Sequence, residues 1–228
     1  MRVVVVGAGS VGRSIARELL VSGHEVTLVD KSPAAMRVAQ VAEARWLLAD
    51  ACELSALSEA GAEQADVVVA ATGDDKANLV VSLLARTEFG VPRTVARVNN
   101  PKNEWMFDEA WGVDVAVSTP RIMTAMVEEA VVVGDLVKIF TFHQSHADIL
   151  GVTLPPGSPL VGVLVGRLQW PQDTVLASIV RDGSPIAPSA DDTLEAGDEL
   201  LFVTGAEADQ RALHRLLSDG PGATSATA

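Results

Sequence analysis

The feature that most constrains the fold is a glycine-rich turn near the start of the chain. A run of four valines, Val3–Val6, leads straight into this turn, and a segment of helical period follows it. A strand, a turn and a helix in this order are typical of the first βα unit of a dinucleotide-binding fold, in which the turn holds a pyrophosphate. The free N–H groups and the positive dipole of the helix N-terminus favour such an anion. The turn has the pattern G-x-G-x-x-G and consists of Gly7, Ala8, Gly9, Ser10, Val11 and Gly12.

Each glycine has a separate role in this interpretation. Gly7 permits the tight turn, Gly9 lets the backbone approach the pyrophosphate, and Gly12 lets the helix pack closely on the strand. The alternative is a structural turn that binds no ligand, with a solvated acidic residue at the end of the next strand. We favour nucleotide binding because the strand, the turn, the helix and the acidic residue are all in register.

That acidic residue is Asp30, which ends the second predicted strand 18 residues after Gly12. A carboxylate at this position accepts hydrogen bonds from both hydroxyls of an adenosine ribose, and it repels a 2′-phosphate. The predicted ligands are therefore NAD(H) or ATP/ADP rather than NADP. Arg13 and Lys31 weaken that exclusion only slightly, and Lys31 is itself a candidate contact.

Short valine-rich runs alternate with helical stretches over residues 2–133. This pattern predicts βαβ units and an α/β fold with a Rossmann-type, doubly wound parallel sheet that is covered on both faces. The predicted strands are Val3–Val6, Val26–Val29, Arg45–Leu48, Val67–Ala71, Thr94–Val98 and Val113–Val117. The predicted helices are Val11–Val21, Ala34–Ala42, Glu53–Ala60, Lys76–Phe89, Asn103–Ala110 and Arg121–Val133, with Ser32 and Thr119 as capping residues before prolines.

Polar residues follow the third, fourth and fifth predicted strands. Ligands of open α/β sheets bind outside the carboxyl ends of the strands, so these residues are candidate contacts to adenine, ribose or phosphate. Thr72 and Arg97 rank highest, because Asp74 is equally suited to capping the next helix and Asn78 to bonding loop backbone. The full set of candidates is Asp50, Ala51, Thr72, Gly73, Asp74, Asn78 and Arg97.

The pattern changes after Gly134 to short β-rich runs separated by proline and glycine turns. We therefore predict a nucleotide-binding domain at 1–134, a small β-rich (α+β) domain at 135–219 and a disordered tail at 220–228. Arg181-Asp182-Gly183 predicts a hairpin turn, and Glu207–Leu217 predicts a terminal helix. The strands predicted in this region are Leu136–Phe142, Ala147–Leu154, Val175–Val180, Ser184–Pro188 and Glu199–Val203.

The helix predicted at Arg121–Val133 is apolar around much of its girth. Apart from Glu128 and Glu129, apolar side chains point from this helix in most directions. A helix of this kind is expected to be buried, which suggests packing against a second copy of the chain. The apolar residues are Ile122, Met123, Met126, Val127, Ala130, Val131 and Val133.

Composition and charge exclude several classes of partner. The chain has 17 Lys and Arg against 30 Asp and Glu, a formal charge of −13 that disfavours nucleic acid and anionic membrane surfaces. No apolar run approaches the roughly 20 residues that a membrane-spanning helix needs, so we expect no direct membrane insertion. The start of the chain does not have the pattern of a secretion signal. The single cysteine, Cys52, indicates a reducing compartment.

No metal site is expected. His143 and His146 fall in a predicted turn without an obvious third ligand, so solvated histidines are favoured over a metal centre. The acidic run from Asp191 to Glu199 is interpreted as a turn and a solvated strand edge. The four tryptophans are expected to anchor the core or an interface; they are Trp46, Trp105, Trp111 and Trp170.

Taken together, these motifs resemble the RCK (KTN) family, the TrkA- and KtrA-type regulatory subunits of bacterial potassium uptake systems. In the first domain the resemblance rests on Gly7–Gly12, Asp30, Ala49–Ala51, Ala70–Asn78, Val95–Asn99 and Ser118–Pro120. The second domain is similar to the TrkA C-terminal domain at Ser158–Gly162, Ile179–Gly183, Ile186–Pro188 and Leu194–Leu200.

The resemblance implies a cytoplasmic regulatory subunit that binds NAD(H) or ATP/ADP. It further implies that this subunit gates an integral membrane potassium transporter subunit, and that it is held through this partner at the inner face of the plasma membrane. It also implies a homo-oligomer, with dimers assembling into a tetrameric or octameric ring whose conformation follows nucleotide occupancy. Ala49 stands where the family commonly has glycine, and Ser10-Val11 lacks the arginine of some ATP-preferring relatives.

A small NAD-dependent dehydrogenase is the alternative, because the glycine turn would serve it equally well. Hydride transfer to a carbonyl needs a proton donor near the carboxyl ends of the strands. The chain contains no tyrosine, and none of its four histidines is predicted at such a strand end; they are His24, His143, His146 and His214. We therefore expect no catalytic residues and no enzymatic activity.

Overall fold

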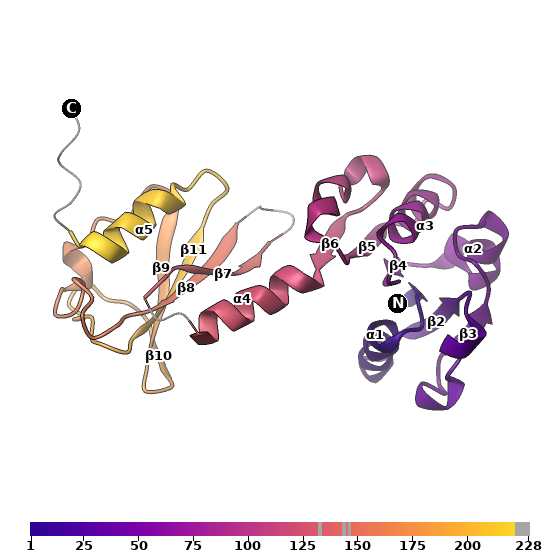
Figure 1. The fold of residues 1–228 in the computed structure, drawn as a ribbon, viewed down its shortest axis with the longest axis horizontal. Coiled ribbons are helices and arrows are strands. Elements are labelled where there is room, and N and C mark those ends of the chain that lie inside the picture. The colour runs from indigo at the N-terminus through magenta and orange to yellow at the C-terminus, as the bar shows by residue number, and fades with distance from the viewer. Residues whose placement is uncertain (132–133, 143–144, 146, 222–228) are drawn as a thin grey trace. The chain divides into compact units, whose positions relative to one another are not determined.

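The structure, a computed structural model, describes residues 1–131, 134–142, 145 and 147–221 (Figure 1). The chain divides into two units between Arg121 and Ile122, and the described residues of each unit form a sheet of their own. The first sheet is parallel and the second is antiparallel. The predicted fold class, a Rossmann-type domain followed by a small β-rich domain, is confirmed.

The sheet of the first unit has the strand order β3-β2-β1-β4-β5-β6. The chain begins in the middle of the sheet, moves outward to β3, and then returns past β1 to build the other half. The strand order therefore reverses between β1 and β4, and this switch point is where doubly wound sheets bind their ligands. The strands are β1 (Arg2–Val6), β2 (Glu25–Asp30), β3 (Arg45–Leu48), β4 (Val67–Ala70), β5 (Arg93–Val98) and β6 (Val115–Ser118).

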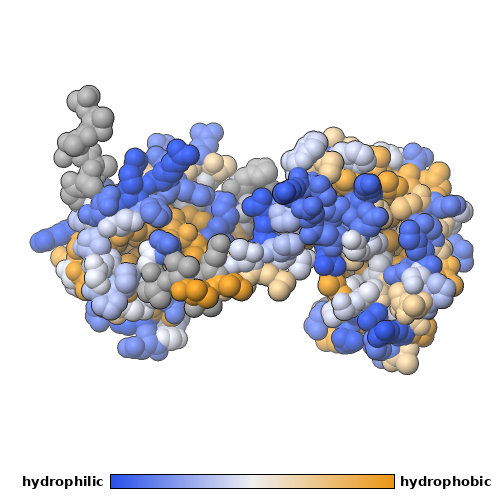
Figure 2. All heavy atoms as spheres, in the orientation of Figure 1, coloured by the Kyte–Doolittle hydropathy of each residue, from blue (hydrophilic) through white to orange (hydrophobic). Residues whose placement is uncertain are grey.

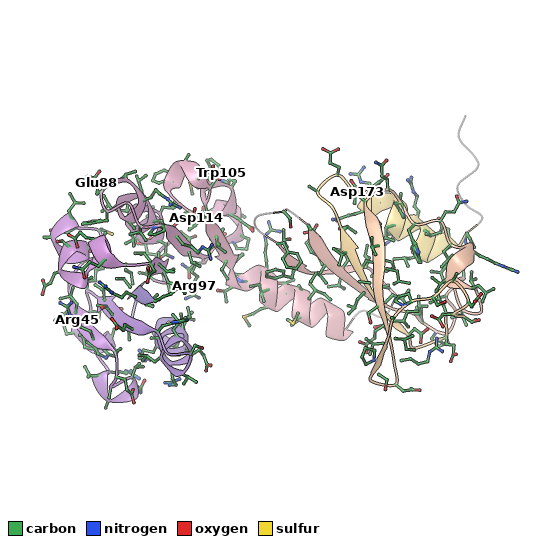
Figure 3. The ribbon with its side chains drawn as sticks, turned by 180° about the vertical axis from the view of Figure 1, so that it is seen from behind. Arg45, Glu88, Arg97, Trp105, Asp114 and Asp173 are labelled. Atoms are coloured by element: carbon green, nitrogen blue, oxygen red, sulfur yellow. The ribbon has the colours of Figure 1, made fainter. Side chains whose placement is uncertain are left out.

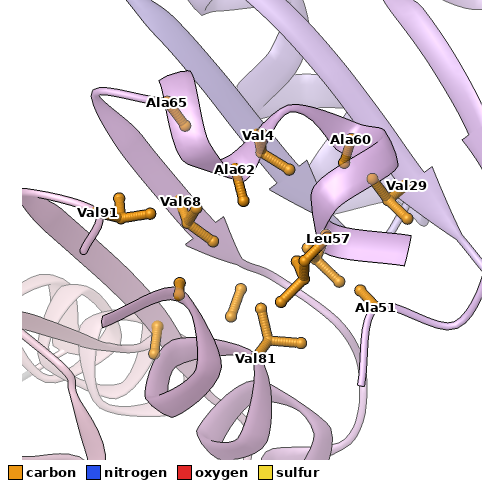
Figure 4. Packing of buried hydrophobic residues seen from close by; sticks show 14 of the residues in the cluster. Val4, Val29, Ala51, Leu57, Ala60, Ala62, Ala65, Val68, Val81 and Val91 are labelled. Carbon is orange, nitrogen blue, oxygen red and sulfur yellow. The ribbon is translucent and has the colours of Figure 1, made fainter. Parts of the chain in front are cut away.

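Helices cover both faces of this sheet. The alternate valines of β1 point to opposite sides, so both faces are apolar and both must be shielded from water. One face packs against α1 (Ser10–Val21). The other packs against α2 (Leu54–Ala60) and α3 (Asp75–Thr87), and Leu57 and Val81 lie fully buried in that core (Figure 4). A short 3-10 turn, η3 (Ala62–Gln64), follows α2.

The helix predicted at Ala34–Ala42 is wrong. The segment instead contains two 3-10 turns, η1 (Pro33–Ala35) and η2 (Val38–Gln40). Side chains 33–40 are exposed or half-buried, so the segment lacks an apolar face to pack, and a short helix without packing is unstable. Ser32 precedes η1, but its side chain makes no capping hydrogen bond.

The helix predicted at Asn103–Ala110 is also wrong. Two 3-10 segments, η4 (Pro101–Met106) and η5 (Glu109–Trp111), replace it. Asp108 separates them, because its carboxylate accepts hydrogen bonds from the backbone N–H groups two and three residues later and so starts a new turn. Trp105 on η4 is 77% exposed and is not a core residue of this chain.

The second unit has a five-stranded antiparallel sheet of order β10-β9-β11-β8-β7. A core centred on Phe202 packs one side of it against the terminal helix α5 (Gln210–Asp219), and Trp170 meets Phe202 edge to face. A 3-10 turn, η6 (Val165–Arg167), contributes to the same core. The strands are β7 (Val137–Thr141), β8 (Asp148–Thr153), β9 (Thr174–Arg181), β10 (Ser184–Ile186) and β11 (Glu199–Thr204).

The predicted hairpin between β9 and β10 is present. Arg181 pairs with Ser184, and the two turn residues, Asp182 and Gly183, have φ values of 49° and 73°. Positive φ at both positions is the geometry that a two-residue Asp-Gly hairpin requires. The acidic run that follows is not simply a solvated edge, because Asp198 is fully buried and receives two hydrogen bonds from the Arg181 guanidinium, at 2.7 and 2.8 Å.

Helix α4 (Thr119–Val131) begins in the first unit, and its residues from Ile122 onward belong to the second. The single chain leaves this helix unburied, because Met123, Val127 and Val131 are 64%, 59% and 73% exposed. Its burial against a second copy stays a prediction. Figure 2 shows apolar surface along the helix. Val133 of the predicted helix lies outside the described residues. Among the residues described, no helix is both long and apolar enough to cross a membrane.

Candidate functional site

A cleft of about 410 Å³ opens at the carboxyl ends of β1 to β5, at the switch point of the parallel sheet. This volume lies in the range of small-molecule and cofactor sites. Twelve of the fifteen predicted site residues line it, and the three exceptions, Ala8, Gly12 and Asn78, are buried behind the wall. The twelve are Gly7, Gly9, Ser10, Val11, Asp30, Lys31, Asp50, Ala51, Thr72, Gly73, Asp74 and Arg97.

The three glycines of the turn differ in what surrounds them. Gly7 has a φ of 101°, and a Cβ there would lie 2.8 Å from the backbone N of Thr72. A Cβ on Gly12 would lie 1.8 Å from the carbonyl oxygen of Gly7. A Cβ on Gly9 would meet nothing within 4 Å. The fold itself therefore requires glycine at positions 7 and 12, whereas at Gly9 the chain leaves open space in the cleft.

Asp30 joins the end of β2 to the glycine turn. Its Oδ2 accepts a hydrogen bond of 2.7 Å from the backbone N–H of Ala8, and its Oδ1 accepts one of 2.8 Å from the backbone N–H of Ser32. The side chain remains half-exposed at the cleft, so its lone pairs are accessible to ribose hydroxyls. Asp30 thus has a structural role in the turn that the sequence pattern did not reveal.

The third strand contributes Asp50 and its neighbours. Asp50 accepts a 3.1 Å hydrogen bond from the backbone N–H of Cys52 and lies 3.4 Å from the Lys31 ammonium. The backbone donor, together with the Lys31 charge, holds the pKa of Asp50 below its ordinary value. Burial, followed by the Asp50 charge, raises the pKa of the Cys52 thiol, so the thiol stays neutral at physiological pH. Lys31 and Asp50 are both well exposed, and their pair contributes little to stability.

Asn78 organises the strand ends on the other side of the switch point. Its side-chain oxygen accepts hydrogen bonds from the backbone N–H of Thr72 at 2.9 Å and from the Thr72 hydroxyl at 2.7 Å. Its amide nitrogen donates to the carbonyl oxygen of Arg97 at 2.8 Å. Asn78 is fully buried, so it positions Thr72 and Arg97 rather than lining the cleft. Asp74 lines the cleft and also caps α3, accepting from the backbone N–H of Lys76.

Asp75 is an organising residue that the sequence analysis missed. Its buried carboxylate accepts four hydrogen bonds, from the backbone N–H and side-chain amide of Asn99, the backbone N–H of Asn100 and the side-chain amide of Asn103. Burial by itself would raise the pKa of Asp75, but these donors outweigh it and hold the pKa below its ordinary value. The partners lie 24 to 28 residues away along the chain, so no local pattern signals them.

Arg97 lies at the carboxyl end of β5 (Figure 3). Its Nε donates a hydrogen bond of 3.2 Å to the hydroxyl of Thr119, the first residue of α4. Among the described residues, Arg97 and Lys31 are the two cationic side chains of the cleft wall, and they lie on opposite sides of the switch point. Thr119 is therefore a hydrogen-bond partner of a cleft residue.

Several cleft residues were not predicted as site residues. Each lies within a few positions of a predicted site residue in the sequence. Once the strand ends are known, the course of the backbone brings these neighbours to the cleft as well. The residues are Val6, Ser32, Ala49, Cys52, Ala71, Ala77 and Val81.

Of the histidines that the structure describes, His24 and His214, neither lines the cleft. His143 and His146 lie outside the described residues. Within the described part of the chain, no three His, Cys, Asp or Glu side chains are grouped as a metal site would require.

A parallel sheet with a ligand-sized cleft at its switch point, followed by a separate antiparallel domain, defines a Rossmann-type binding protein with an accessory domain. Residues 3–119 match the TrkA-N domain and residues 149–217 match the TrkA-C domain. The chain belongs to the TrkA family. Membership in this family is consistent with a protein that is not an enzyme.

Known relatives agree with this assignment. The Trk system potassium uptake protein TrkA of Mycobacterium tuberculosis (strain ATCC 25618 / H37Rv) is 54% identical over 95% of this chain and 98% of its own length. The TrkA homolog of Methanothermobacter thermautotrophicus is 31% identical over 94% of this chain and 99% of its own length. The TrkA of Vibrio alginolyticus is 31% identical, and this chain spans 46% of its length.

Among solved structures, the GsuK channel bound to NAD has a similar fold. It superposes with a TM-score of 0.66 and 17% sequence identity, covering 95% of this chain and 39% of that one. A Kef C-terminal domain from Shewanella denitrificans in its AMP-bound form gives a TM-score of 0.51 and 21% identity over 57% of this chain and 79% of that one. At these identities the likeness concerns the fold.

Proposed function

We propose that this protein is a cytoplasmic, nucleotide-sensing regulatory subunit of a membrane potassium uptake system. The observation that carries the proposal is the cleft, where open space at Gly9 faces the switch point and a half-exposed Asp30 lies beside it. The potassium uptake role is supported by the names of relatives, one of them 54% identical over nearly the whole chain.

The proposed ligand is NAD(H) or ATP/ADP. The glycine turn takes the phosphates, Asp30 takes the adenosine ribose and disfavours NADP, and the strand-end residues complete the pocket. The NAD-bound GsuK neighbour supports a nucleotide of this class on the same fold. We retain all fifteen predicted site residues, with Ala8, Gly12 and Asn78 acting from behind the wall. We also retain the domain division at 134/135 and the tail at 220–228.

The proposed partner is an integral membrane potassium transporter subunit, which the protein contacts from the inner face of the plasma membrane. The proposed assembly is a homo-oligomer, a dimer that builds a tetrameric or octameric ring. Nucleotide binding shifts such a ring only if one conformation binds the nucleotide more tightly than the other. The exposed apolar side chains of α4 supply a surface for the contact between copies.

The first experiment is a panel of NADH, NAD, ATP, ADP and NADPH, measured by thermal unfolding and titration calorimetry. A nucleotide at about 100 times its Kd adds about 2.7 kcal/mol of stability, a rise of several degrees in Tm. We expect stabilisation by NADH or ATP/ADP and none by NADPH, and Asp30→Asn should admit NADPH. Asp66→Asn is the matched control, because Asp66 also accepts a backbone hydrogen bond but lies outside the cleft wall.

A panel without any stabilisation would refute the nucleotide-sensing function. The dehydrogenase alternative would be favoured instead if bound NADH were consumed in the presence of a small carbonyl compound. A regulatory subunit returns the nucleotide unchanged.

A further inference from the structure

Helix α4 follows the parallel sheet without a connecting loop, because β6 ends at Ser118 and α4 begins at Thr119. The same helix continues beyond Ile122 into the second unit. A change in how firmly the first turn of α4 is held therefore affects a helix that continues from one domain into the next.

Two side-chain contacts hold this first turn. The Nε of Arg97 donates to the Thr119 hydroxyl at 3.2 Å, and Arg121 forms an ion pair with Glu104 of η4. The η4 segment is itself tied to α3 through the hydrogen bond from Asn103 to Asp75. Of the two contacts on α4, the one through Arg97 comes directly from the cleft wall.

The guanidinium of Arg97 has a second edge to offer. A guanidinium carries five N–H donors in a planar fork, and the hydrogen bond from the Arg97 side chain within the described residues engages Nε. The terminal Nη edge suits the acceptor oxygens of a ligand, as in bidentate recognition of phosphate. Arg97 lines the half of the cleft beyond the switch point, whereas Asp30 and Lys31 line the other half.

We infer that Arg97 is a positioning residue that transmits occupancy of the far half of the cleft to α4. A ligand that reaches across the switch point binds the terminal nitrogens of Arg97 and fixes the guanidinium in the orientation that engages Thr119. The first turn of α4 is thereby held more firmly. An adenine mononucleotide that fills only the half beside Asp30 binds without this effect. The inference rests on the proposed nucleotide site. It adds that the length of the ligand decides whether α4 is affected, because only a ligand that reaches Arg97 has this effect.

Hydrogen exchange of the full chain, with and without NADH, ATP or AMP at saturation, tests the inference. We expect NADH or ATP to slow exchange of the α4 amides at residues 123–127 about tenfold, and AMP to slow it less than about twofold. In Thr119→Val the slowing should disappear, because valine offers no acceptor. The nucleotide Kd of Thr119→Val should stay within about threefold of the wild-type value. The open state of the first turn is rare, so a change in how tightly the ligand holds this turn hardly alters the overall affinity.

Two variants serve as controls. Thr119→Ser keeps the hydroxyl and should restore the slowing. Thr124→Val removes an exposed hydroxyl from the same helix without touching Arg97 and should behave as the wild type.

The outcomes separate the two proposals. Slowing that persists in Thr119→Val, equal slowing by AMP, or binding without any slowing in the wild type would each overturn the link while leaving the nucleotide site intact. Absence of binding by every nucleotide, measured first by calorimetry, would refute the proposed function and this inference with it.

Discussion

At the scale of single residues, the glycine turn separates what the fold needs from what a ligand needs. A Cβ at position 12 would collide with the carbonyl oxygen of Gly7, so Gly12 is required for α1 to pack on β1. A Cβ on Gly9 has no neighbour within 4 Å, and Gly9 has an ordinary φ of −66°. The chain alone gives no steric reason for glycine there, and the open space suits the close approach of the proposed nucleotide.

Gly9→Ala should therefore weaken nucleotide binding without harming the fold. The free energy of unfolding should change by less than about 1 kcal/mol. Alanine lowers the conformational entropy of the unfolded chain, and this gain offsets the slightly poorer helix cap that alanine makes. The affinity of the variant for the nucleotide found in the panel should fall at least about tenfold. Gly12→Ala, the matched comparison, should lose about 3 kcal/mol of stability, since backbone must shift. Undiminished nucleotide affinity in Gly9→Ala would show that the phosphates do not approach this residue.

At the scale of elements, the segment η4 has little regular structure of its own and is held in position by Asp75. Four N–H donors converge on its carboxylate, from residues 99, 100 and 103. The same cluster reaches the cleft, because the Asn99 amide also donates to the carbonyl oxygen of Thr72. Asp75 thus fixes both the β5–β6 connection and the strand end at the cleft.

Asp75→Asn should destabilise the chain by about 2–4 kcal/mol, because an amide nitrogen replaces one acceptor and faces donors. The pKa of Asp75 is lower in the folded chain than its ordinary value of 3.8, so its contribution is complete at neutral pH. It is lost as the pH falls below about 3.8 through the folded-state pKa, and the variant should show a shallower loss there. Urea unfolding from pH 7 to pH 3 measures both effects.

The control for this prediction is Asp108→Asn. Asp108 caps η5, and asparagine caps equally well, so the stability should change by less than about 0.5 kcal/mol. A loss in Asp75→Asn no larger than in this control would mean that the cluster contributes nothing beyond local capping.

The sequence predicted elements well where a local pattern decides them. The parallel strands and the Asp-Gly hairpin appear within two residues of their predicted bounds, because valine runs and positive-φ turns act over short distances. The helix predicted at Ala34–Ala42 failed because side chains 33–40 leave no buried face, and the helix predicted at Asn103–Ala110 failed because Asp108 starts a new turn within it. Most cleft residues followed from the rule that ligands bind at strand ends. The roles of Asp75 and the Arg97–Thr119 bond did not, because they depend on contacts made only after folding.

At the scale of the whole molecule, charge is unevenly distributed. Residues 122–228 hold 14 of the 30 acidic side chains but five of the 17 basic ones. Cytoplasmic loops of membrane proteins are enriched in Lys and Arg, so an acidic subunit complements such a partner electrostatically. Two copies of this chain repel each other instead. In the proposed oligomer the contacts between copies therefore come from apolar surface, and higher salt should strengthen them by screening the repulsion.

The apolar side chains of α4 are the surface that meets this requirement. We expect the wild type to be at least dimeric at micromolar concentration, with a mass above the 23.8 kDa of one chain, and more so at about 0.5 M than at about 0.05 M salt. The double variant Met123→Glu/Val127→Glu should be monomeric, because burying two unpaired carboxylates costs more than the contact gains. Thr124→Glu on the same helix should remain associated. Light scattering after size exclusion distinguishes these masses, and a wild type that stays monomeric at both salt concentrations would leave the exposed apolar side chains of α4 to another partner.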